Sequence, residues 1–161
     1  MKKCKIAVLD DYQNVALESA DWSVLRDRAD IAVFQNHLAD PDAVIEQLLP
    51  FDVVCAMRER TPLPRNVIER LPNLKLIAST GSGNASIDVA AAGERGIAVV
   101  HTGYRPGPTI EFTWALILAA ARHIVTESNS VRSGGWQQTV GMDLGGKTIA
   151  WISTRPTAPK I

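Results

Sequence analysis

The residues with the clearest chemical potential in this sequence form a glycine-containing turn. Gly81, Ser82 and Gly83 follow a β-branched apolar run at 74–79, Asn84 comes next, and a helix-like segment begins soon afterwards. A tight turn between a strand and a helix directs backbone N–H groups at an anion. Glycine permits a positive φ angle and lets a ligand approach the backbone closely. The turn is therefore either an anion site or an ordinary strand-to-helix connection.

Two arginines and a histidine follow other apolar runs. Arg58 and Arg60 come directly after residues 52–57, and His101 follows 97–100. A guanidinium group binds carboxylate or phosphate in a forked geometry, although either arginine could equally be a solvated surface charge. His101 could contact a ligand or cap local backbone. We assign no Ser-His-Asp arrangement, carboxylate pair or metal-ligand spacing, so the expected site binds an acid and holds no metal.

Residues 141–148 spell the G-x-x-x-x-G-K-T phosphate-loop pattern. That loop must follow a strand and open a helix. Here the pattern precedes a β-branched run, and the residues upstream make a poor strand. We therefore predict no nucleoside triphosphate site at this position.

The elements that would position these residues alternate between apolar strands and helices. Strands are predicted at 5–9, 31–34, 52–57, 74–79 and 97–100, and helices at 15–29 (interrupted near 19–21), 40–49, 64–71 and up to residue 92. Strands that are apolar throughout indicate a parallel sheet covered on both faces. The pattern predicts an α/β fold, a flavodoxin-like doubly wound parallel sheet over 1–103. Its ligand crevice would lie at the carboxyl ends of the strands, where the polar residues above occur.

The character of the chain changes after residue 103. Residues 104–135 form a proline-containing linker and the longest helix, predicted at 110–131 and apolar on most sides. Such a helix must pack between two bodies or two subunits, which predicts a homodimer through 110–131. Residues 136–146 read as a loop, and 147–153 as an orphan strand that begins a second βα unit.

Composition excludes several classes of protein. Lys and Arg number 17, as do Asp and Glu, so the formal charge of zero favours neither nucleic acid nor an anionic membrane as partner. The apolar fraction of 46% supports a packed core. No apolar run reaches the ~20 residues that span a bilayer. Cys4 and Cys55 read as buried thiols of a cytoplasmic protein, with a disulfide left open.

Three stretches together resemble a known family. They are LKLIASTGSGNASIDVAAAGERGIAVVHTGY at 74–104, TIEFTWALILAAARHI at 109–124 and GGWQQTVGMDLGGKTI at 134–149. In this order they resemble the D-isomer-specific 2-hydroxyacid dehydrogenases, which include D-3-phosphoglycerate dehydrogenase. The resemblance implies a flavodoxin-like substrate-binding domain for a small 2-hydroxy or 2-oxo acid. A crossover helix would then lead into a Rossmann domain that binds NAD(H).

The resemblance also implies roles for individual residues. The substrate carboxylate would bind the backbone N–H groups of Ser82 and Gly83 in the turn that begins at Gly81, with Asn84 beside them. Arg58 matches the arginine that approaches the substrate, with Arg60 a nearby substitute. Glu111 matches the acidic residue that opens the crossover helix.

The chain departs from the family after residue 149. The family continues into a glycine-rich NAD fingerprint, whereas residues 149–156 read IAWISTRP, so we expect no cofactor-binding residue here. The family's catalytic Arg, Glu and His would lie beyond the end of this chain. We expect 136–161 to be the truncated start of a Rossmann domain, through an altered reading frame or an early stop, and the chain alone to be inactive. The alternative is a stand-alone flavodoxin-like module that binds small acids or dimerises without catalysis.

Overall fold

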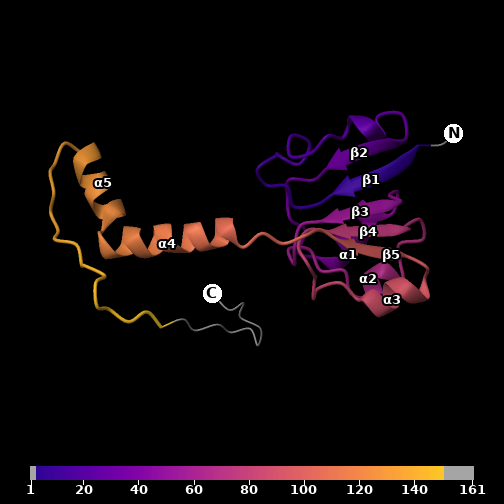
Figure 1. The fold of residues 1–161 in the computed structure, drawn as a ribbon. Helices are drawn as coiled ribbons and strands as arrows, with labels where there is room; N and C mark the ends of the chain where they lie inside the picture. Colours follow the sequence, from indigo (N-terminus) through magenta and orange to yellow (C-terminus); the bar gives the residue numbers. More distant parts are fainter. Residues whose placement is uncertain (1–2, 151–161) are drawn as a thin grey trace. The chain divides into compact units, whose positions relative to one another are not determined.

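The fold is described from a computed structural model of the chain, which places residues 3–150 (Figure 1). The chain divides into two compact units, Met1–Tyr104 and Arg105–Ile161. Unit 1 contains the sheet and the residues of the candidate site, and unit 2 contains two helices and the loop that follows them. Each unit is described by itself.

Unit 1 is built on one parallel sheet of five strands. The strands are β1 Cys4–Val8, β2 Ala29–Val33, β3 Val53–Ala56, β4 Leu76–Ser79 and β5 Ala98–His101. Their order in the sheet is β2-β1-β3-β4-β5, and every neighbouring pair is parallel (Figure 1). This is the flavodoxin-like strand order, so the predicted α/β fold is confirmed. All five predicted strands form, and no end is shifted by more than two residues.

One face of the sheet carries three helices, α1 Pro41–Leu48, α2 Arg65–Ile68 and α3 Val89–Glu94. The first begins as predicted: the Asp40 side chain accepts hydrogen bonds from the N–H groups of Asp42 and Ala43, and proline occupies the first helical position. The main core lies between these helices and the sheet. It includes Ala7, Val54, Ile77, Leu48, Leu63, Val67, Ile68 and Leu71, all buried.

The opposite face differs from the sequence prediction. The helix predicted at 15–29 is absent, and the segment forms turns and one short 3₁₀ helix, η1 Ser23–Leu25. Local polar contacts replace helical hydrogen bonds. The Asp11 carboxylate accepts the N–H groups of Val15 and Ala16, at 3.1 and 2.9 Å, and the Trp22 indole donates to the Ala16 carbonyl. Side chains that satisfy nearby backbone in this way compete with a helix.

The prediction of a single helix at 110–131 in unit 2 is also wrong. The structure has two helices, α4 Gly107–Ala121 and α5 Ile124–Arg132. His123 separates them with a left-handed backbone, φ 53°, which ends the first helix. The N–H of Met142 donates to the Ala121 carbonyl at 2.7 Å. A loop that is distant in sequence therefore supplies a hydrogen-bond donor for a carbonyl group at the end of α4, which has no partner within the helix.

The part of unit 2 that follows α5 has no regular structure within the described range. Residues 133–150 form neither helix nor strand, so the start of the predicted strand, 147–150, is not a strand. Its remainder, 151–153, lies outside the described residues. Between residues 3 and 150, no helix is long and apolar enough to span a membrane.

Candidate functional site

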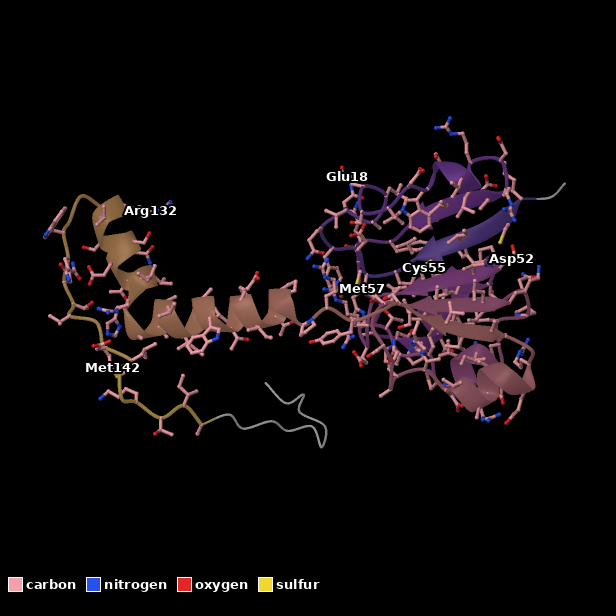
Figure 2. All side chains as sticks on the ribbon, viewed as in Figure 1. Glu18, Asp52, Cys55, Met57, Arg132 and Met142 are labelled. Carbon is pink, nitrogen blue, oxygen red and sulfur yellow. The ribbon has the colours of Figure 1, made fainter. Side chains whose placement is uncertain are left out.

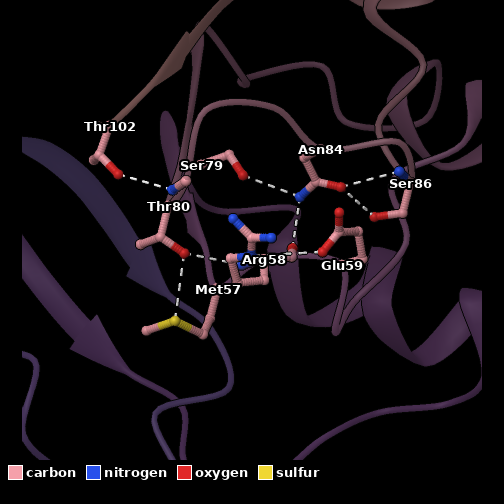
Figure 3. Close-up of polar contacts among 9 residues, drawn as sticks. Met57, Arg58, Glu59, Ser79, Thr80, Asn84, Ser86 and Thr102 are labelled. Carbon is pink, nitrogen blue, oxygen red and sulfur yellow. Dashed lines mark hydrogen bonds and ion pairs between the residues drawn. The ribbon is translucent and has the colours of Figure 1, made fainter. Parts of the chain in front are cut away.

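The predicted site residues of unit 1 lie where β3, β4 and β5 end. The loop at 57–61 follows β3, the turn at 80–84 follows β4, and Thr102 follows β5 (Figure 3). Because the three strands are parallel and adjacent, their carboxyl ends meet at one edge of the sheet. In open α/β sheets this edge is where ligands bind.

The turn after β4 leaves backbone donors without partners. Gly81 has φ 92°, and its N–H donates to the Thr102 hydroxyl at 2.8 Å. The next three N–H groups, of Ser82, Gly83 and Asn84, donate to no acceptor within residues 3–150. Ser82 and Gly83 are exposed, and Gly83, unlike Gly81, does not have the positive φ that the sequence allowed for it. Adjacent unfilled N–H donors in a turn form an anion-binding surface.

Arg58 lies directly against this turn. Its guanidinium group is so close to Gly81 that a Cβ atom at Gly81 would collide with it, and it also lies 5.9 Å from the Tyr104 ring centre. The backbone of Arg58 is left-handed, with φ 53°, and its N–H donates to the Thr80 hydroxyl at 3.0 Å. A non-glycine residue held in this conformation is strained by about 1–3 kcal/mol. The surrounding structure therefore fixes an arginine beside the free donors.

The Asn84 side chain supports the turn and the Arg58 loop and does not point toward a ligand. Its amide nitrogen donates to the Arg58 carbonyl at 2.5 Å and to the Ser79 hydroxyl at 3.0 Å. Its amide oxygen accepts from the N–H and the hydroxyl of Ser86, at 3.0 and 2.6 Å (Figure 3). Both functional ends of the side chain are thus occupied, and Asn84 is 8% exposed. Only its backbone N–H remains available to a ligand.

Arg60 has different neighbours from Arg58. Its guanidinium donates to the Asp10 carbonyl at 2.7 Å and lies 4.5 Å above the centre of the Tyr12 ring. Both contacts are at the end of β1. The structure therefore joins Arg58 with residues 81–84, and it ties Arg60 to the neighbouring strand end.

Several polar residues around the turn received no role in the sequence prediction. Thr80 and Thr102 hold the loop at 57–61 and the turn at 80–84 through their hydroxyl groups, and Ser79 supports Asn84. The available signal was a hydroxyl residue at or just after a strand end. His101, which was considered, pairs in register with Ser79 at the end of β5 and is exposed.

Residues 133–150, where the family would begin its cofactor domain, offer no fit to a dinucleotide. Pyrophosphate binding needs a strand, a glycine-rich turn and a helix in succession. Residues 133–150, the described part that follows α5, contain no such unit. No cluster of three or more metal-capable side chains occurs among residues 3–150 either.

A flavodoxin-like sheet with unfilled backbone donors at its carboxyl edge places the chain among the open α/β domains, which bind ligands at that edge. Comparison with known proteins then identifies the family. The profile of the D-isomer specific 2-hydroxyacid dehydrogenase catalytic domain matches residues 6–155. The chain belongs to this family, as the sequence predicted.

Individual relatives agree with this assignment. The chain is 32% identical over 144 residues to hydroxypyruvate reductase of Thermotoga maritima, covering 88% of this chain and 46% of that protein. It is 32% identical over 145 residues to glyoxylate reductase of Thermofilum pendens, covering 86% of this chain and 38% of that one. The crystal structure of a phosphoglycerate oxidoreductase from Vibrio cholerae superposes with a TM-score of 0.81 at 38% identity, covering 90% and 47%. The chain therefore spans less than half the length of these relatives.

Proposed function

We propose that residues 1–103 are the substrate-binding domain of a D-2-hydroxyacid dehydrogenase, and that Arg58 and the turn at 81–84 bind the substrate carboxylate. One observation carries the proposal: three consecutive N–H groups without acceptors, among the described residues, lie beside an arginine held in a strained conformation. A carboxylate at this position would accept hydrogen bonds from the N–H groups and a charge-assisted hydrogen bond from the Arg58 guanidinium.

The substrate class follows from what the relatives' names share. Hydroxypyruvate, glyoxylate and phosphoglycerate are all small acids with an oxygen on the carbon next to the carboxylate. For this chain we propose a small 2-hydroxy or 2-oxo acid. Arg58 would neutralise the carboxylate while the turn orients it by hydrogen bonds. Arg60, fixed on Asp10 and Tyr12, would contribute positive charge at the adjacent strand end.

NAD(H) is the proposed cofactor of the whole dehydrogenase, in which it would exchange hydride with the substrate carbon. Residues 133–150 do not fit that group, so the part we assign to this chain is binding and orientation of the acid. Residues 104–135 would link to the cofactor domain, and 136–161 would correspond to its start. We assign no catalytic residue within this chain and propose that it is inactive alone.

The surface of unit 2 supports a proposal about association. Side chains project from α4 along its length (Figure 2), and most of its large apolar residues are exposed, Phe112 at 65%. We propose a homodimer through α4 and α5. We also propose a cytoplasmic location, supported by Cys4 and Cys55, which are both free thiols.

The carboxylate proposal is tested by titrating the isotopically labelled 161-residue chain with glyoxylate and following backbone amide signals by NMR. We expect saturable shifts at Ser82, Gly83 and Asn84. Acetate should shift the same signals more weakly, and the neutral analogue acetamide should not shift them.

Arg58→Asn is the matched variant, because asparagine tolerates the left-handed backbone but lacks the charge. We expect a loss in glyoxylate affinity of about tenfold or more, as for a charge-assisted contact. The control is Arg26→Ala, which removes an exposed arginine of the β1–β2 segment. Shifts spread over other residues, or equal effects of the two variants, would contradict the proposed site.

A further inference from the structure

A polar cluster around one buried carboxylate lies at the end of β1, next to the loop that holds Arg58. We call Asp10, Tyr12, His37, Arg60 and Thr61 the β1-end cluster. The Asp10 carboxylate, 1% exposed, is its centre. It accepts from the Thr61 hydroxyl at 2.7 Å and from the Tyr12 hydroxyl at 3.4 Å, and the His37 ring nitrogen Nδ1 lies 3.2 Å away.

The backbone of Asp10 is fixed as firmly as its side chain. Its φ is 57°, and its carbonyl accepts from the Arg60 guanidinium. On either side, the N–H of Leu9 donates to Cys55 in β3, and the N–H of Asp11 donates to Phe34 after β2. Asp10 is therefore a rigid point attached to two neighbouring strands.

Asp10 holds the end of the 57–61 loop that follows Arg58. The N–H of Arg60 donates to the Met57 carbonyl at 3.3 Å, which closes a turn around Arg58 and Glu59. Beyond the turn, Thr61 is anchored on Asp10. On the other side, Asn84 holds the Arg58 carbonyl. The left-handed conformation of Arg58 is thus fixed from two directions, by Asn84 and by the β1-end cluster.

The cluster is not a second ligand site. The cavity beside Asp10, Asn36 and Thr61 has a volume of about 10 Å³, which is room for one water molecule. The carboxylate faces protein groups, and no metal-capable group of three surrounds it within the described chain. Its contacts indicate that the cluster holds the loop at 57–61 in place.

We propose that Asp10 and Thr61 form a positioning pair: the buried carboxylate–hydroxyl contact keeps the loop closed and Arg58 directed at the turn. The proposal rests on the carboxylate site described above. Without the contact, Arg58 relaxes toward an ordinary right-handed or extended backbone, and only the remaining left-handed fraction binds the acid. Apparent affinity falls in proportion to that fraction.

The test compares two substitutions of the same residue. Thr61→Val keeps the shape and loses the hydroxyl, whereas Thr61→Ser keeps the hydroxyl and loses a methyl group. We expect the glyoxylate dissociation constant to rise about tenfold in Thr61→Val, the loss expected when a hydrogen bond to a charged group is removed. We expect Thr61→Ser to stay within about twofold. Thr113→Val, which removes a hydroxyl that bonds Thr109 in α4, is the control.

A second readout does not depend on the ligand. The three-bond H–N–Cα–H coupling of Arg58 reports its φ angle, and we expect it to change in Thr61→Val and to be restored in Thr61→Ser. Asp10→Gly, which tolerates the left-handed backbone of that position and removes the acceptor for Thr61, should give the same change if Thr61→Val fails to fold.

The outcomes separate this proposal from the one on which it rests. If the unaltered chain shows no glyoxylate shifts at 82–84, the carboxylate site is wrong, and the Arg58 coupling still decides the positioning role. If Thr61→Val lowers the unfolding midpoint but changes neither the affinity nor the coupling, the pair is merely structural and the positioning proposal is overturned.

Discussion

Gly81 and Arg58 both have positive φ angles, and the two conformations depend on each other. Gly81 at 92° bends the chain so that the next N–H groups face outward, and its missing side chain leaves the space that the Arg58 guanidinium fills. Arg58 at 53° directs its side chain into that space. Strain of this kind persists where the surrounding structure over-determines it. Here it places a cation beside backbone donors.

A substitution at Gly81 tests this dependence. We expect Gly81→Ala to destabilise unit 1 by about 1–3 kcal/mol, because alanine is strained at this φ and its Cβ collides with Arg58. Glyoxylate shifts at Ser82 and Gly83 should disappear as Arg58 is displaced. Urea unfolding followed through the NMR signals of β3 and β4 measures the stability.

Gly83→Ala is the matched control, since nothing lies within 4 Å of a Cβ atom there and its φ is not positive. Its stability should stay within about 0.5 kcal/mol of the unaltered chain. Equal destabilisation by both alanines would show that the turn needs glycine for general flexibility and not for contact with Arg58.

At the scale of elements, unit 2 depends on contacts between its helices and the loop after them. The Glu127 carboxylate of α5 accepts the N–H of Gln138 at 3.0 Å and both the N–H and the hydroxyl of Thr139, at 2.7 and 2.5 Å. The hydrogen bond from the Thr139 hydroxyl has the largest effect on the pKa of Glu127, followed by that from the Gln138 N–H, and both hold this pKa below its ordinary value. One carboxylate therefore fixes the loop to the helix.

This contact predicts an acid transition confined to unit 2. Because the folded pKa of Glu127 is lowered, its contribution is present above the unfolded value of about 4.3 and is lost as pH falls through the folded value. We expect the amide signals of Gln138 and Thr139 to move toward unstructured positions only below about pH 4. Glu127→Gln should shift them at neutral pH, whereas Glu111→Gln should not. Signals that stay constant to pH 2.5, well below the ordinary glutamate pKa of about 4.3, would contradict this role.

The helix predictions failed where distant contacts decide the local structure. The apolar run from 110 to 131 reads as one helix, because its pattern contains no signal for the Met142 N–H that ends α4 at Ala121. The segment at 15–29 has helical spacing, but the Ala16 carbonyl accepts from the Trp22 indole and not from a helical backbone N–H. By contrast, the Asp40 cap and the apolar strands carry their own local signals, and these predictions are confirmed.

At the scale of the molecule, alternation of strands and helices was enough to predict the sheet, because right-handed crossovers leave few ways to order five parallel strands. The same reasoning predicted that Arg58 and the glycine turn share one edge, and they do. It could not separate Arg58 from Arg60, since two residues in one loop have identical strand context. Only the folded chain shows one arginine on Gly81 and the other on Tyr12.

The exposed helix of unit 2 predicts how whole chains associate. Phe112 and Leu116 lie four residues apart on α4, so they occupy one side of the helix, and they are 65% and 55% exposed. Each Å² of apolar surface that leaves water stabilises an interface by about 25 cal/mol, so these exposed side chains favour association between two copies of the chain.

We therefore expect light scattering over a dilution series to show twice the mass of one chain at high concentration. The double substitution Phe112→Lys and Leu116→Lys should give monomers, because each lysine places a charge where an apolar contact formed. Glu111→Lys, which also adds positive charge to α4 but removes no apolar side chain, should leave the dimer intact. Because association is assigned to unit 2 and acid binding to unit 1, the double variant should keep the glyoxylate shifts of Ser82 and Gly83. Loss of both properties together would place the acid site at the dimer interface and would overturn the assignment of carboxylate binding to unit 1 alone.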